Sequence, residues 1–142
     1  ISVCRRLQVI ASEDIGLAYP LAVSVTRAAC ESAKELGMPE ARIPLANAAI
    51  LLATAPKSNS AEAAIDAAMA DIEAGFGRNV PRHLQSPLFK GYKYPHSYPN
   101  HYVEQQYLPD DVKNRQYYVY GENKTEQAAK DYATKIGSIK KK

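Results

Sequence analysis

The sequence predicts a mainly α-helical bundle that carries an irregular extension. Apolar residues recur at spacings of three and four through the first half of the chain, and glycines and prolines separate these segments. Residues 80–120 then hold five of the nine prolines and eight of the ten tyrosines, which excludes a long helix there. At 46% hydrophobic residues, the 142-residue chain can build one core. It contains no run near the roughly 18–20 apolar residues of a membrane span.

We therefore expect residues 1–79 to form the helical core, and residues 80–142 to form an irregular segment plus a last helix, packed on the same domain. Charge divides the chain at the same place. Residues 1–79 hold seven Lys/Arg and nine Asp/Glu, a balance of −2, whereas residues 80–142 hold eleven and six, a balance of +5. The two halves therefore differ in character.

Two helices are predicted in residues 1–36. The first covers about 1–14 and ends at Gly16. Its expected apolar stripe is Val3, Leu7 and Ile10. The second runs over 20–36, since Pro20 suits a first helical turn and Gly37 suits a left-handed C-terminal cap. Its expected stripe is Leu21, Val25, Ala29, Ala33 and Leu36.

The third helix is predicted over 44–55 and is apolar nearly all round. We expect Leu45, Ala48, Ala49 and Leu52 to face inward, although Ile50 and Leu51 are apolar too. Such a helix is either central or covered by another subunit. A fourth helix follows Asn59, which with Glu62 approximates a capping box. Its stripe is Ile65, Met69, Ile72 and Phe76.

Residues 80–120 are too rich in aromatic side chains for a disordered linker. We expect an ordered segment that lays tyrosine rings over the helical core, with a short strand near 92–94 or 117–120. A last helix is predicted over 122–137, and its expected stripe is Ala128, Ala129, Tyr132 and Ile136. Residues 140–142, all lysine, are expected to fray.

Catalytic, cofactor and metal sites find little support in the pattern. Cys4 and Cys30 form no CxxC pair, so we expect buried, reduced thiols. His83, His96 and His101 match no zinc spacing, and we expect them to be structural, with hydrogen bonds to the backbone. We assign no catalytic residue, no cofactor ligand and no metal ligand.

Two segments are candidates for anion or DNA contact. Lys57, Ser58 and Asn59 combine a cation, polar side chains and a helix N-terminus, although an interhelical turn with an N-cap is the simpler explanation. Arg82, Lys90 and Lys93 alternate with tyrosines in the basic half. That half either contacts single-stranded nucleic acid or has tyrosines packed on the protein and solvated lysines.

Taken together, several segments resemble the C-terminal region of the RarA/MgsA family. These are AAA+ ATPases related to clamp loaders and to the eukaryotic Werner-helicase-interacting ATPase. The resemblance spans about residues 2–120. Its motifs are Arg5–Leu7, Ser12–Ala18 with Pro20, Leu36–Glu40, Arg42–Ala46, Leu52–Ser60, Val80–Leu84, Gly91–His96 and Gln105–Pro109. Two departures stand out. Gln85 occupies a usual arginine position, and the stretch between Leu84 and Gly91 is shorter than usual.

The resemblance implies a collar-like helical domain that holds subunits together as a homotetramer. It also implies a DNA-dependent ATPase that acts at stalled or damaged replication forks, in the cytoplasm at the bacterial nucleoid, and that associates with single-strand-binding protein. ATP and Mg²⁺ would belong to an ATPase core that is absent from these residues. We expect no chemistry in this chain and no membrane partner. Helix periodicity alone suggests Ile50, Leu51 and Phe76 as interface residues.

Overall fold

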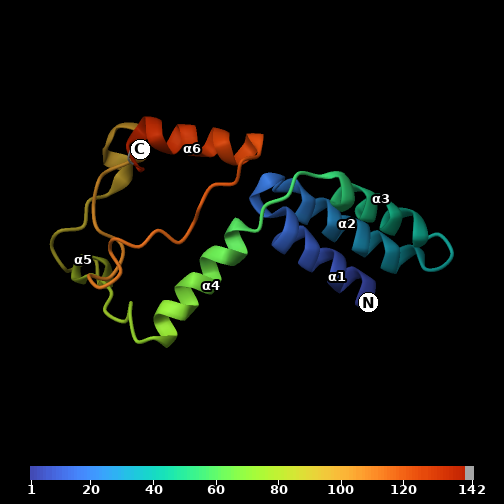
Figure 1. Cartoon of the computed structure of the whole chain (residues 1–142), viewed down its shortest axis with the longest axis horizontal. Helices are drawn as coiled ribbons and strands as arrows, with labels where there is room; N and C mark the ends of the chain where they lie inside the picture. Colours follow the sequence, from blue (N-terminus) through green and yellow to red (C-terminus); the bar gives the residue numbers. More distant parts are fainter. Residues whose placement is uncertain (140–142) are drawn as a thin grey trace. The chain divides into compact units, whose positions relative to one another are not determined.

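The structure, a computed structural model, describes residues 1–139 and is α-helical (Figure 1). The predicted tail at 140–142 lies outside the described residues. The α-helices are α1 (Ser2–Ile10), α2 (Leu21–Leu36), α3 (Arg42–Thr54), α4 (Ser60–Glu73), the four-residue α5 (Arg82–Gln85) and α6 (Lys124–Ile136). Shorter helical segments are the π-helix η1 (Ala11–Ile15) and the 3₁₀ helices η2 (Gly16–Ala18), η3 (Pro95–Ser97) and η4 (Pro99–His101). The predicted fold class, mainly α, is confirmed.

The chain forms two compact units. The first comprises residues 1–63 together with 120–127, and the second comprises 64–119 with the described residues from 128 onward. The boundary expected at residue 79 falls inside the second unit. Both α4 and α6 contribute residues to each unit.

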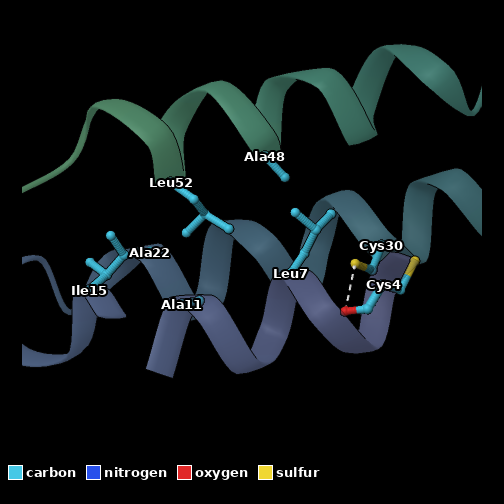
Figure 2. Packing of buried hydrophobic residues seen from close by; sticks show 8 residues of the cluster. All are labelled: Cys4, Leu7, Ala11, Ile15, Ala22, Cys30, Ala48 and Leu52. Carbon is cyan, nitrogen blue, oxygen red and sulfur yellow. Dashed lines mark hydrogen bonds between the residues drawn. The ribbon is translucent and has the colours of Figure 1, made fainter. Parts of the chain in front are cut away.

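Helices α1, α2 and α3 pack side by side in the first unit (Figure 1). Their shared core consists of Cys4, Leu7, Ala11, Ile15, Ala22, Cys30, Ala48 and Leu52. Figure 2 shows Leu52 of α3 pointing into the contact between α1 and α2. Most of these side chains are small, so the helices gain close approach and bury little area per residue.

The helices begin and end near the predicted residues, but the buried faces differ from the predicted stripes. On α2, Ala33 is buried as predicted, but the other buried residues, Ala22, Thr26 and Cys30, lie one position along from the expected Leu21, Val25 and Ala29. Leu21 is 60% exposed and Leu36 is 56% exposed. On α1, Leu7 is buried as predicted, while Val3 is exposed and Cys4 is buried instead. On α2 the buried side chains are small, which lets the neighbouring helices approach closely, whereas Leu21 and Leu36 lie largely exposed.

The same correction applies to α3, α4 and α6. Ala48 and Leu52 of α3 are buried as predicted, while Ala49 is exposed. The α4 stripe that we expected to pack inward remains about half exposed at every position: Ile65, Met69, Ile72 and Phe76. On α6, Glu126 and Ala133 are buried, whereas Ala128, Ala129 and Tyr132 are exposed.

Residues 1–139 contain no β-strand, so the expected strand near 92–94 or 117–120 is wrong. The side chain of Gln105 explains why the first of these does not form. Its Oε1 accepts the Lys93 amide at 3.0 Å, and its Nε2 donates to the Lys93 carbonyl at 2.7 Å. One side-chain amide therefore satisfies the backbone groups that a neighbouring strand would have paired.

Candidate oligomer and nucleic-acid interfaces

The three residues predicted to lie at an oligomer interface all retain exposed surface. Ile50, on α3, is 63% exposed, and Leu51 beside it is half-buried. Phe76, just after α4, is 40% exposed, and the Arg115 guanidinium lies 6.0 Å from its ring centroid. Ile50 belongs to the first unit and Phe76 to the second.

Other apolar side chains extend this exposed surface. Ile43 lies two helical turns before Ile50 on the same side of α3 and is 53% exposed. Helix α3 is therefore not enclosed by its own chain. The sequence periodicity showed that α3 is apolar on nearly all sides, but it did not show which of these sides packs against α1 and α2.

The anion candidates Lys57, Ser58 and Asn59 lie in the turn between α3 and α4. Lys57 Nζ donates to the carbonyls of Ala53 and Ala55, and the Ser58 amide donates to the Asp14 carbonyl at 2.8 Å. The Asn59 carbonyl accepts the Ala63 amide as α4 begins. These contacts close the turn and satisfy carbonyls at the end of α3, as the simpler alternative expects.

A groove of about 710 Å³ adjoins this turn. It is lined mainly by apolar side chains of α1 and α3, with Asp14, Lys57, Ser58 and Asn59 at its polar part. Asp14 and Lys57, residues of opposite charge, both line this groove, so its net charge does not favour an anionic ligand.

The second group of candidates, Arg82, Lys90 and Lys93, lies wholly in the second unit. The Arg82 guanidinium stands 4.3 Å above the centroid of the Phe89 ring, a cation–π contact. Lys90 lines a hollow of about 560 Å³ together with Tyr92 and Phe89. Lys93 Nζ donates to the Glu104 carbonyl at 3.4 Å. All three cations are exposed to solvent.

The tyrosines of this unit divide into two groups. Tyr117 packs as predicted, because its hydroxyl donates to Asp71 Oδ2 at 2.8 Å. That hydrogen bond, with smaller contributions from burial and from the Asp71 charge, raises the pKa of Tyr117. The rings expected to cover the core include four that are instead 40–59% exposed: Tyr92, Tyr94, Tyr98 and Tyr107.

The three histidines also have different surroundings. His83 is structural as predicted, with Nε2 at 2.8 Å from the Gln106 carbonyl. His96 and His101 are exposed and in ring contact instead: the Tyr94 and His96 centroids are 5.2 Å apart, and those of His96 and His101 are 4.8 Å apart. The sequence pattern did not indicate this row of rings, since a spacing of five residues matches neither helix nor strand. Residues 1–139 hold no group of three or more His, Cys, Asp or Glu side chains placed to share a metal ion.

The two cysteines are buried and free, as predicted. Cys30 Sγ donates to the Cys4 carbonyl at 3.8 Å across the α1–α2 contact (Figure 2). Burial is the main cause that raises the pKa of the Cys30 thiol. The hydrogen bond with Cys4 and the charge of the Cys4 side chain raise this pKa further. A thiol in this setting is a poor nucleophile.

These features describe an all-helical domain, over residues 1–139, that leaves apolar helix faces exposed. Residues 1–137 match the family described as "MgsA AAA+ ATPase C terminal". The chain belongs to this family, and the resemblance found in its motifs is confirmed.

Known relatives agree with this assignment. The chain is 56% identical over 126 residues to replication-associated recombination protein A of Bacillus subtilis, covering 82% of this chain and 30% of that protein. It is 36% identical over 126 residues to the Escherichia coli protein of the same name, covering 82% of this chain and 28% of that one. It is also 34% identical over 128 residues to ATPase WRNIP1 of Dictyostelium discoideum, covering 83% and 15%.

The chain thus spans less than a third of the length of these relatives. Gln85, where the resemblance led us to expect an arginine, donates from Nε2 to the Val80 carbonyl at 2.7 Å and closes the turn that contains α5. Among residues 1–139, none of the helices combines the length and apolar character that crossing a bilayer requires.

Proposed function

We propose that this domain assembles copies of a replication-associated recombination ATPase into a homotetramer. The parent protein would act at stalled or damaged replication forks as a DNA-dependent ATPase, in the cytoplasm at the bacterial nucleoid, together with single-strand-binding protein. ATP and Mg²⁺ would bind in its ATPase core, and this domain would perform no chemistry. Its role would be to hold several ATPase cores close together on DNA.

The proposal rests on the apolar side chains that helices α3 and α4 leave exposed. Ile43 and Ile50 give α3 an outer apolar face, and Ile65, Met69 and Ile72 give α4 another. Each side chain is at least half exposed. Burying a side chain of this kind fully is worth about 1.5–3 kcal/mol. Such surfaces, when contiguous, mark interfaces with other proteins.

The mass of the 142-residue chain in solution tests this proposal. Multi-angle light scattering over a range of concentrations should give a tetramer of about 62 kDa. A mass of 15.6 kDa at every concentration would refute the proposal.

A charge placed on the outer face of α3 locates the interface. Ile50→Glu should shift the population toward the monomer, because a carboxylate would have to be desolvated there. The matched control is Ser24→Glu, which adds the same charge at an exposed polar position of α2. Equal loss of assembly in both variants would show that Ile50 is not at the interface.

A further inference from the structure

The second unit presents a row of three exposed rings: Tyr94, His96 and His101. Neighbouring ring centroids are 5.2 and 4.8 Å apart, with interplanar angles of 45° and 46°. Side chains of this size usually cover apolar surface, but Tyr94 is 59% exposed. The row therefore offers ring surface to something other than the protein itself.

The backbone holds these rings in place through the two short 3₁₀ helices η3 and η4. The amides of Ser97 and His101 donate to the carbonyls of Tyr94 and Tyr98, each at 3.0 Å, so that two short turns follow each other. Asn100 and His101 both have positive φ, 56° and 53°. A histidine whose backbone adopts the left-handed conformation is uncommon, and this conformation costs free energy. His101, which adopts it, is also the residue whose ring contacts the His96 ring.

A cation and a further ring are fixed beside this row. The Gln105 side chain binds both backbone groups of Lys93, and its Nε2 also donates to the Tyr107 hydroxyl at 2.8 Å. Gln105 therefore connects Tyr107, which is 49% exposed, to the residue that precedes Tyr94. Tyr92, the residue before Lys93 in the sequence, borders the 560 Å³ hollow that Lys90 also lines.

The charge of this segment favours an anionic partner. Residues 82–107 contain three Lys/Arg (Arg82, Lys90 and Lys93) and one acidic residue, Glu104. Exposed rings next to cations fit an unpaired nucleic-acid strand, whose bases stack on the rings while its phosphates meet the cations. A duplex hides the faces of its bases, so the rings discriminate against it.

We infer that the Tyr94–His96–His101 row and Lys93 form a binding surface for single-stranded nucleic acid. This surface is separate from the apolar faces of α3 and α4 that the proposed assembly uses. Bases stack on the ring row, and the three cations neutralise the backbone without reading its sequence.

Fluorescence anisotropy with a labelled oligothymidylate tests the inference on the 142-residue chain. The strand should bind at 50 mM salt. With about three phosphates neutralised, raising the salt to 200 mM should weaken binding roughly twentyfold. A duplex of equal length should bind distinctly more weakly. Absence of binding at 50 mM salt, or a preference for the duplex, would overturn the inference.

Ring substitutions distinguish stacking from general attraction. Tyr94→Ala should weaken binding about tenfold, while Tyr94→Phe should retain it. Tyr132→Ala is the matched control, because Tyr132 of α6 is 58% exposed in the same unit but lies outside the row. Equal effects of the two alanine variants would refute a role for the row.

Circular dichroism and light scattering on each variant keep the two proposals apart. Loss of strand binding by Tyr94→Ala with the oligomer intact is the expected result. A failure of tetramer formation by the unmodified chain would refute the assembly proposal and leave strand binding standing.

Discussion

Replacing Gly16 by alanine should destabilise the domain more than replacing Gly37, although both glycines need a backbone that other residues avoid. Gly16 has φ 49° and ψ −132°, and Gly37 has φ 69° and ψ −179°. A side chain in such a conformation costs about 1–3 kcal/mol. Both substitutions therefore carry this conformational cost.

The two glycines differ in the space around them. A Cβ at Gly16 would lie 2.9 Å from the Ser58 carbonyl oxygen, whereas a Cβ at Gly37 would meet nothing within 4 Å. Ser58 cannot easily move away, because its amide donates to the Asp14 carbonyl at 2.8 Å. Overpacking of this kind costs about 1–3 kcal/mol. We expect Gly16→Ala to cost about 2–6 kcal/mol, the sum of the two costs, and Gly37→Ala about 1–3 kcal/mol.

Urea unfolding monitored by far-ultraviolet circular dichroism measures this difference. All samples should have the same protein concentration, because association shifts apparent stability. If Gly16→Ala proves no more destabilising than Gly37→Ala, the close approach of Gly16 to Ser58 does not constrain the fold.

Two further predictions concern single polar groups. Thr26 is fully buried, and its hydroxyl has no hydrogen-bond partner among the described residues; Thr26→Val should therefore raise the free energy of unfolding by about 1 kcal/mol in the same assay. The control Thr54→Val, at an exposed hydroxyl that donates to a backbone carbonyl, should not stabilise, and equal gains would contradict the reasoning. Because its bond to Asp71 raises the pKa of Tyr117, the folded state favours the protonated phenol. The stabilisation that this hydrogen bond contributes is fully present below pH 10, and it is lost as the pH rises through the raised pKa of Tyr117. Tyr117→Phe should thus lose part of the alkaline pH dependence of the unfolding free energy, and an unchanged pH profile would exclude this contribution.

Helix positions could be predicted from the sequence because they depend on local chemistry. Gly16 and Gly37 end helices with positive φ as expected, and α3 stops before Pro56. These residues restrict the backbone wherever they occur. Local rules of this kind need no knowledge of what packs against what.

The buried faces could not be predicted in the same way. Periodicity finds the bulkiest apolar stripe, and on α2 that stripe was Leu21 and Val25. Helix packing instead brought Ala22, Thr26 and Cys30 inside. The choice between two adjacent faces depends on neighbouring helices, and no local pattern contains that information.

Little of the ring row could be predicted either. The composition indicated that the tyrosine-rich half is ordered and basic, and this holds. The contact of His96 with His101 depends on two successive short turns and a left-handed residue. The position of Lys93 depends on one side-chain amide, that of Gln105. Neither the ring contact nor the position of Lys93 produces a repeating pattern in the sequence that could have predicted it.

The small inner side chains of α2 have a consequence for how this domain folds. Alanine, threonine and cysteine add little hydrophobic stabilisation when they leave water. Leu21, Leu36, Ile43 and Ile50 of α2 and α3 are each more than half exposed in the single chain. In the proposed assembly, a neighbouring copy that covered these side chains would add hydrophobic stabilisation, and association would then be linked thermodynamically to folding.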